Sequence, residues 1–245
     1  MKPCIAIPIY DHGGTVGKVV EDVASLGLPC LIVDDGSGEP TRLELQRLAG
    51  RHPWIKIIHH GRNLGRGAAL RTAYSRASEQ GFTHVVQIDA DGQHDTGDLP
   101  KFLDAAKRSP DSLILGRPIF DASVPRARLY GRQISRAIVW IETHSMQVED
   151  PLCGFRCIPL EPTLQLLGHR STGDRMDFDP ELVVRLVRCG IRVINVPTRV
   201  RYPEGGISHF HMVYDNLRLA RTYLRLALDG LPGRREILRH QAPPS

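Results

Sequence analysis

The chain has no long apolar segment. Its 245 residues contain no uninterrupted apolar stretch close to the roughly 20 residues that a membrane-spanning helix needs. Because an apolar β-type run, residues 4–10, stands at the start of the sequence, we expect no signal peptide. The five cysteines are odd in number and lack the spacing of a disulfide scaffold, which fits a reducing compartment. These absences exclude a secreted disulfide-rich protein and predict a cytoplasmic location.

Aromatic residues are also scarce. Phe, Trp and Tyr make up 6% of the chain, which leaves few side chains for stacking on bases, and no recognisable nucleic-acid module is present. We therefore expect no nucleic-acid partner. Positive charge is in excess, with a net charge of +5, and this favours anionic partners such as nucleotide sugars, lipid phosphates or a membrane surface.

Apolar β-type runs alternate with helical patterns along the chain, which predicts strand-helix-strand units. The β-type runs are 4–10, 30–33 and 85–88, and the helical stretches are 43–48, 68–77 and 99–106. We expect one α/β domain over residues 1–232, with a mainly parallel, Rossmann-like sheet flanked by helices and an amphipathic helix at its end. Residues 233–245, charged and ending in proline, are expected to form a flexible tail.

Two carboxylates follow the buried run 85–88 directly, in the segment Asp89-Ala90-Asp91-Gly92-Gln93-His94. A parallel strand ending there presents hard oxygen ligands at the carboxyl edge of the sheet. Mg²⁺ and Mn²⁺ use one or two protein carboxylates and take further ligands from water and substrate phosphates. The pair therefore indicates a divalent cation and a nucleotide-diphosphate substrate, although a solvated turn that caps the next helix is an alternative.

Other strand ends carry related motifs. Run 30–33 ends in Asp34-Asp35-Gly36-Ser37, the first run leads into Gly13-Gly14, and Asn63-Leu64-Gly65-Arg66-Gly67 precedes a helical stretch. In this order the motifs resemble family 2 glycosyltransferases of the GT-A fold, in particular the branch similar to dolichyl-phosphate mannose synthase. The resemblance extends over nearly the whole chain and depends on several spaced motifs.

The resemblance implies a binding site for a nucleotide-diphosphate sugar. It implies that Asp35 contacts the base, whereas Asp34 either shares the pocket or only caps its turn. Arg117 is a candidate phosphate or acceptor contact, because a guanidinium can bind two oxygens, and a plain surface arginine is the alternative. The predicted nucleotide-sugar site comprises Pro8, Tyr10, Asp11, Asp34, Asp35, Asn63, Gly65, Arg66, Asp89, Ala90, Asp91 and Arg117.

The same resemblance implies a metal site. Asp91 coordinates Mg²⁺ or Mn²⁺, Gln93 adds an oxygen, and Asp89 contacts the metal, the ribose or the sugar. The cation acts as a Lewis acid on the departing phosphate. His211 is a further candidate contact to phosphate or metal.

Inverting transfer to a hydroxyl needs a carboxylate base. Residues 177–186 resemble the acidic motif of the family, which implies that Asp179 is that base, although Phe178 replaces the usual Glu; the alternative is that Asp179 caps the helix. Asp150 is the second candidate base. A polyprenyl-phosphate acceptor is already anionic and needs none.

Two loops are implied to lie near the acceptor. Residues 149–156 resemble a loop beside donor sugar and acceptor, which includes Gly154, Phe155 and Arg156. Residues 202–211 resemble a glycine-hinged loop that closes over the diphosphate, with Ser208 and His209 as its candidates.

Two helical segments combine apolar residues with arginine. Residues 213–231 carry an apolar stripe beside Arg218, Arg221 and Arg225. Residues 131–141 carry a second apolar face, formed by Ile134, Ile138 and Ile141, and the basic residues of that region are Arg128, Arg132 and Arg136. A basic amphipathic helix can lie on an anionic membrane, so we predict peripheral contact at the inner face of the cytoplasmic membrane. The alternative is a helix that packs its apolar face on the domain.

We therefore predict an inverting, metal-dependent glycosyltransferase that moves a sugar from a nucleotide-diphosphate sugar to a lipid-linked or lipid-like acceptor. A polyprenyl-phosphate sugar synthase is the nearest alternative. A sugar-phosphate nucleotidyltransferase is disfavoured, because residues 8–12 contain no Arg or Lys of an activating loop. A non-catalytic nucleotide-sugar binding protein is disfavoured by the intact acidic motifs.

Overall fold

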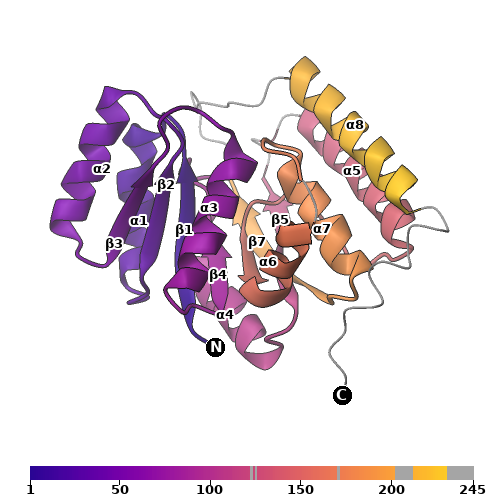
Figure 1. Cartoon of the computed structure of the whole chain (residues 1–245), viewed down its shortest axis with the longest axis horizontal. Helices are drawn as coiled ribbons and strands as arrows, with labels where there is room; N and C mark the ends of the chain where they lie inside the picture. The colour runs from indigo at the N-terminus through magenta and orange to yellow at the C-terminus, as the bar shows by residue number, and fades with distance from the viewer. Residues whose placement is uncertain (122–123, 125, 170–171, 202–211, 231–245) are drawn as a thin grey trace.

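The computed structural model describes residues 1–121, 124, 126–169, 172–201 and 212–230. A seven-stranded sheet in the order β3-β2-β1-β4-β6-β5-β7 forms the centre of the molecule (Figure 1). Its strands are β1 Pro3–Ile9, β2 Cys30–Asp34, β3 Ile55–His59, β4 His84–Gln87, β5 Leu113–Phe120, β6 Arg156–Pro159 and β7 Val193–Val200.

The sheet is parallel except for one strand. β1 runs parallel to β2 and β4, β2 to β3, and β5 to β7, whereas β6 runs antiparallel to both β4 and β5. The prediction of a mainly parallel, Rossmann-like sheet is confirmed. The reversed strand was not anticipated, and it brings the turn before β6 to the same edge as the end of β4.

Helices cover both faces of the sheet. In Figure 1, α3, α6 and α7 lie in front of the strands and α1 lies behind them. The predicted helical stretches 43–48, 68–77, 99–106 and 131–141 fall within α2, α3, α4 and α5, and the segments 177–186 and 213–231 overlap α7 and α8. The helices are α1 Gly13–Ala24, α2 Glu39–Arg51, α3 Arg66–Glu79, the short 3₁₀ helix η1 Thr96–Asp98, α4 Leu99–Arg108, α5 Arg126–Thr143, α6 Leu160–His169, α7 Phe178–Arg188 and α8 Met212–Asp229.

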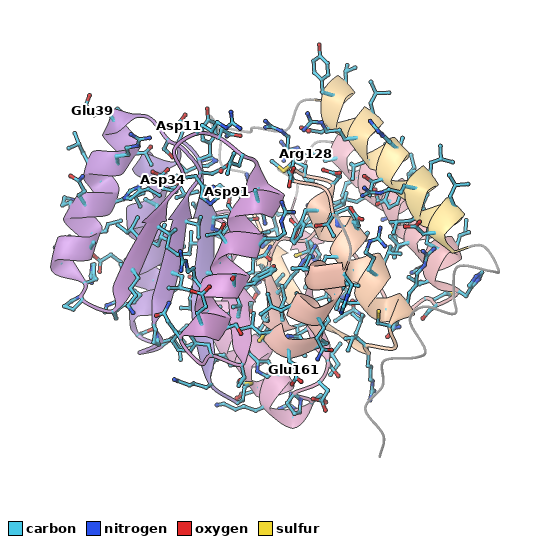
Figure 2. All side chains as sticks on the ribbon, in the orientation of Figure 1. Asp11, Asp34, Glu39, Asp91, Arg128 and Glu161 are labelled. Carbon is cyan, nitrogen blue, oxygen red and sulfur yellow. The ribbon has the colours of Figure 1, made fainter. Side chains whose placement is uncertain are left out.

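The inner strands are apolar on both faces because helices cover both. Every residue of β2 and β4 is buried, and in β1 only the first residue is partly exposed. Such strands contain continuous apolar runs instead of an alternating pattern, which is why their positions could be predicted from the sequence. Their buried ends carry the polar loops to one edge of the sheet. Figure 2 shows Asp11, Asp34 and Asp91 along that edge, with Arg128 across from them.

Helices α5 and α8 contact each other at the margin of the molecule and lie side by side in Figure 1. α8 packs inward through Leu219, Tyr223 and Leu226. Its other apolar stripe faces outward: Leu217 is 64% exposed and Leu224 63%. α8 therefore packs one apolar side on the domain, as the alternative predicts, while the stripe that includes Leu217 and Leu224 does not cover the core. The described part of the chain contains no helix whose length and apolar character would suit a membrane span.

Candidate functional site

A cleft of about 700 Å³ opens at the carboxyl edge of the sheet. Residues after β1, among them Tyr10 and His12, form one part of its wall, and residues after β4 form the adjoining part. β2 pairs with one side of β1 and β4 with the other, so this is the point where successive strands are added in opposite directions. Ligands of open α/β sheets bind at such a point.

Most of the predicted donor and metal residues meet in this cleft. One wall contains the predicted residues Pro8, Tyr10, Asp35, Asn63, Gly65, Arg66, Asp89, Ala90, Asp91 and Gln93. Gly154 and Asp179 also line it, from the turn before β6 and from the first turn of α7. The strand ends have thus brought together motifs that are separated by more than 100 residues.

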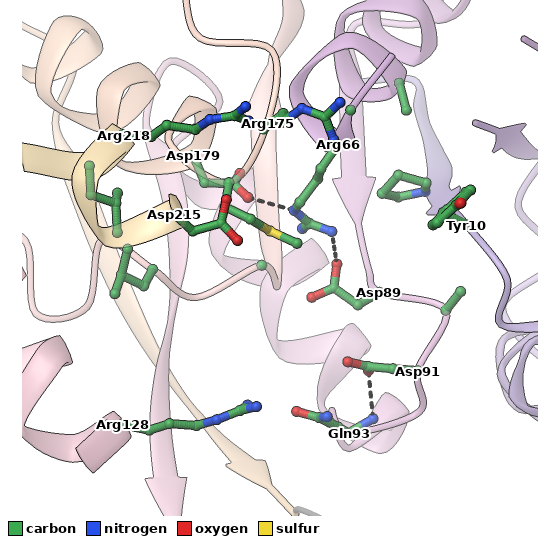
Figure 3. Close-up of a pocket in the computed structure, with 18 of the residues that line it drawn as sticks. Tyr10, Arg66, Asp89, Asp91, Gln93, Arg128, Arg175, Asp179, Asp215 and Arg218 are labelled. Carbon is green, nitrogen blue, oxygen red and sulfur yellow. Dashed lines mark hydrogen bonds and ion pairs between the residues drawn. The ribbon is translucent and has the colours of Figure 1, made fainter. Parts of the chain in front are cut away.

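Arg66 joins two carboxylates at the centre of the cleft (Figure 3). Its Nη1 lies 2.6 Å from Oδ1 of Asp89, and its Nε donates to Oδ2 of Asp179 at 2.7 Å. Burial acts to raise the pKa of Asp89, but the charges of Arg66 and His94 hold it well below its ordinary value. Asp89 is therefore ionised, and the ion pair with Arg66 orients its carboxylate.

Asp179 is held by a second arginine. Nη1 of the fully buried Arg156 lies 3.2 Å from Oδ1 of Asp179, and Gln87 donates to the same oxygen at 3.4 Å. The cap position of α7 is Asp177, so Asp179 is not the helix cap. Both oxygens of the Asp179 carboxylate are engaged, and a substrate hydroxyl would have to compete with these donors.

Asp91 has a different environment. Its Oδ1 accepts a hydrogen bond from the backbone N–H of Gln93 at 3.0 Å. Burial and the nearby charge of Asp89 raise the pKa of the Asp91 carboxyl, so a cation beside it would be favourable. Among the described residues no group of three or more His, Cys, Asp or Glu side chains could hold a metal unaided. The oxygens of Asp91 and Gln93 fit Mg²⁺ or Mn²⁺ that also binds substrate phosphates.

Asp35 organises the loop before α3. Its carboxylate accepts hydrogen bonds from the N–H of Leu64 at 3.0 Å and of Gly65 at 2.7 Å, and lies 2.7 Å from Nδ1 of His60. Gly65 has φ +107°, a conformation in which a side chain would be strained. Asp35 lines the cleft while holding this loop, so the loop cannot shift without changing the cleft wall.

Three residues predicted for the nucleotide-sugar site do not line the cleft. Asp34 is fully buried, and its carboxylate accepts a hydrogen bond from the Ser37 N–H at 2.9 Å. It therefore caps its own turn, which is the alternative stated for this residue in the sequence analysis. Asp11 accepts the Gly38 N–H at 2.7 Å. Arg117, on the exposed part of β5, pairs with Glu149 at 3.5 Å, as a surface arginine does. None of the three belongs to the cleft lining.

The predicted loop before β6 is mostly structural. Asp150 pairs with Arg132 at 2.7 Å and accepts the Leu152 N–H at 2.9 Å, so its carboxylate is committed to the turn. Phe155 stacks on Phe102 with ring centroids 4.1 Å apart.

Arg156 braces the same loop. It donates to the carbonyls of Pro151 and Cys153 at 2.9 and 2.7 Å. Within the predicted loop 149–156, Leu152 and Gly154 line the cleft, whereas Asp150, Phe155 and Arg156 do not. Ser208, His209 and His211 lie outside the residues that the structure describes.

Comparison with known proteins identifies the family. The profile described as "Glycosyl transferase family 2" matches residues 4–158, which is more than half of the chain. The chain belongs to glycosyltransferase family 2. A polyprenol monophosphomannose synthase of Mycolicibacterium smegmatis is 26% identical to this glycosyltransferase over 95% of the chain and 88% of the relative. An undecaprenyl-phosphate mannosyltransferase of Micrococcus luteus is 25% identical over 85% and 87%.

Solved structures share the fold of this glycosyltransferase. A glucosyl-3-phosphoglycerate synthase of Mycobacterium tuberculosis with Mn²⁺ and UDP-glucose has a TM-score of 0.66 at 16% identity, over 94% of this chain and 78% of the other. A mannosyltransferase of Pyrobaculum calidifontis with GDP-mannose and Mn²⁺ has a TM-score of 0.61 at 16% identity, over 93% and 64%. The predicted GT-A fold is confirmed.

The wall opposite the carboxylates was not predicted as part of the site. In this glycosyltransferase it comes mainly from α5 and α8, two helices whose arginines we had assigned to a membrane-facing stripe. Arg128 approaches from the side opposite Asp91 in Figure 3. No local motif marks these residues, because the packing of helices decides which side faces the cleft. The polar residues of this wall include Arg128, Arg132, Ser135, Arg175, Asp215, Asn216 and Arg218.

Proposed function

We propose that this glycosyltransferase moves a sugar from a nucleotide-diphosphate sugar to a lipid acceptor that ends in a phosphate, with inversion and with a divalent cation. One observation carries the proposal: the cleft has a wall of carboxylates and, across from it, a wall from α5 and α8 that includes Arg128, Arg132 and Arg218. A metal-bound diphosphate fits the first wall, and a second phosphate fits the other.

On the donor side, Asp91 and Gln93 would hold Mg²⁺ or Mn²⁺. The cation would supply Lewis-acid stabilisation of the leaving diphosphate. Tyr10 and Asp35 line the part of the cleft next to β1, where base and ribose would lie. Arg66 would keep Asp89 ionised and directed at the metal, the ribose or the sugar.

On the acceptor side, the state of Asp179 favours a phosphate. Both of its carboxylate oxygens already accept from or pair with buried donors. A hydroxyl acceptor would require one of them to take a proton, whereas an ionised phosphate attacks without a base. That phosphate would be bound and oriented by arginines from three places: α5, α8 and the loop before α7.

The relatives support this class of acceptor. Two proteins that match most of this chain are named as a polyprenol monophosphomannose synthase and an undecaprenyl-phosphate mannosyltransferase. Structural neighbours were solved with UDP-glucose or GDP-mannose and Mn²⁺, which supports a nucleotide-sugar donor and a divalent metal. The sugar and the base are left open in the proposal.

The proposal includes peripheral contact with the inner face of the cytoplasmic membrane. The outward surfaces of α5 and α8 carry exposed apolar side chains: Tyr130 is 70% exposed, Ile134 61% and Leu217 64%. We name the exposed residues Tyr130, Ile134, Ile141, Val213, Leu217 and Leu224 the apolar face. Such a surface beside arginines suits the boundary of an anionic bilayer, from which a lipid phosphate would enter the cleft.

The test has two steps. Thermal shift with UDP-, GDP- and dTDP-sugars plus Mn²⁺ identifies the donor, because a ligand that binds only the folded state raises its stability. Transfer of the labelled sugar is then measured to a short polyprenyl phosphate and to the matching polyprenol. We expect transfer to the phosphate alone. Transfer to the alcohol would overturn the proposed acceptor, and no stabilisation by any nucleotide sugar would overturn the proposed donor.

A further inference from the structure

A second pocket, of about 640 Å³, lies beside the cleft. Its walls come from the loop before α3, the loop before α7 and one side of α8. We call it the arginine pocket. Five arginines line it: Arg62, Arg175, Arg218, Arg221 and Arg225.

The positive charges of the arginine pocket are only partly balanced. Two aspartates line it: Asp174 already pairs with Arg71, whereas Asp177, which accepts from the neutral Thr222 hydroxyl at 3.0 Å, leaves one carboxylate charge beside five arginines. Arg225 is occupied by Glu181 at 2.6 Å. Within the described part of the chain, the structure gives no ion pair or hydrogen bond to the side chains of three exposed arginines, Arg62, Arg218 and Arg221.

Guanidinium groups that converge without counter-charges repel each other, and an anion between them removes that cost. A guanidinium also matches phosphate oxygens through paired N–H donors. Arg62 comes from a loop, Arg175 from a second loop and Arg221 from α8, so the donors approach from different sides. This arrangement encloses an anion, whereas a solvated stripe on one helix would not.

We propose that the arginine pocket binds a phosphate group other than those of the donor and the acceptor in the cleft. The arginine pocket shares Arg175 and Arg218 with the cleft, whereas Arg62 and Arg221 line the arginine pocket and not the cleft, so these two residues serve to test it separately. The phosphate belongs either to an anionic lipid headgroup or to a free phosphate compound. α8 carries both the arginine side and part of the apolar face, so a headgroup could reach the pocket at the edge of a bilayer.

The first experiment measures the shared chemistry. Binding of radiolabelled pyrophosphate is followed by equilibrium dialysis in EDTA, without donor sugar, for the wild type and for Arg62→Gln/Arg221→Gln. Both side chains are exposed and lack partners among the described residues, so the variant is expected to fold, and its thermal unfolding is recorded alongside. We expect affinity at this site to fall at least about tenfold, because the lost hydrogen bonds are charge-assisted.

The matched control is Arg108→Gln/Arg192→Gln. It removes the same charge from two exposed arginines that line neither pocket, and it should bind pyrophosphate as the wild type does. Equal weakening in the control would show that only net charge matters and would overturn the site. Unchanged affinity and stoichiometry in Arg62→Gln/Arg221→Gln would also overturn it.

The second experiment separates the two sources of phosphate. Sedimentation is compared with vesicles of phosphatidylcholine alone and of phosphatidylcholine mixed with phosphatidylglycerol. If the ligand is a lipid headgroup, Arg62→Gln/Arg221→Gln loses the extra binding to the mixed vesicles and the control keeps it. If the variant loses pyrophosphate binding but sediments like the control, the ligand is a free phosphate compound. Neither result depends on sugar transfer, so failure here leaves the proposed function standing.

Discussion

The two walls of the cleft are built differently. On the wall next to β1 and β4, each predicted acidic group is fixed by interior contacts: Asp35 by two backbone N–H groups and Asp89 by Arg66. On the wall from α5 and α8, long arginine side chains predominate, and Arg218 is exposed. The first wall is thus held by more interior contacts than the second, and we expect it to be the side that holds the proposed metal and diphosphate.

The largest effect is expected on the wall next to β1 and β4. Asp91→Asn should reduce transfer by about 10³-fold or more, because the metal supplies several kcal/mol of charge stabilisation. It should also abolish Mn²⁺-dependent nucleotide binding while the protein stays folded. Transfer assays and thermal shift with and without Mn²⁺ measure both. Full activity of the wild type in excess chelator would contradict the metal's role.

The next substitution tests Asp179, the carboxylate that contacts both Arg66 and Arg156. Asp179→Asn removes the charge that faces two buried or half-buried arginines, so we expect a loss of about 3 kcal/mol in the free energy of unfolding. We also expect weaker donor binding, since Arg66 would lose one of its two anchors. Urea unfolding and donor titration measure these losses.

The same variant distinguishes a base from a positioning residue. If Asp179 positions Arg66, the pH profile of kcat/KM keeps its shape in Asp179→Asn. A loss of about 10²-fold with a hydroxyl acceptor, unchanged donor binding and a missing acid limb would instead make Asp179 the base.

A smaller effect is expected from a substitution at Gly154, in the turn before β6. A Cβ added at Gly154 would lie 2.8 Å from Nη2 of Arg66 and 2.9 Å from Cγ of Asp89. Gly154→Ala should therefore displace this ion pair, lower stability by about 1–3 kcal/mol and reduce transfer. Gly168→Ala, in α6 with nothing within 4 Å of the added carbon, is the control and should retain wild-type transfer. Wild-type stability of Gly154→Ala would show that the turn before β6 can yield.

The smallest effect on the fold is expected at the outer surface. Leu217→Asn on the apolar face should change stability by less than about 0.5 kcal/mol, because the side chain is 64% exposed. It should still reduce sedimentation with vesicles, since apolar area inserts into the interface. Leu43→Asn, 57% exposed on α2, is the matched control. Equal sedimentation of both variants would argue against membrane contact through α8.

The sequence predicted the wall next to β1 and β4 well, for a local reason. Residues that directly follow a buried parallel strand must lie at its carboxyl edge, so Tyr10, Asp35, Asp89 and Asp91 could be placed without knowing the rest of the fold. Misplaced residues show the limit of this argument. Asp34 and Asp35 are adjacent, yet one faces inward to its turn and the other faces the cleft.

The wall formed by α5 and α8 could not be predicted from local sequence patterns. The arginines of α8 were recognised, but helix periodicity gives only their spacing and not what the helix packs against. The reversal of β6 was likewise missed, since a short apolar strand carries no sign of its direction. The direction follows from pairing with β4 and β5, whose positions in the sequence are distant.

The reversal of β6 has a consequence for how such an enzyme diversifies. β5 and β6 are antiparallel neighbours in the sheet, so the segment between them leaves and returns on the same side of the sheet. That excursion carries Arg128, Arg132 and Gly154. This segment can change in length or sequence while the order and pairing of β1 to β4 stay the same. Changes in this one stretch of the sequence would alter the α5 part of the proposed acceptor side while β1 to β4 stay in place.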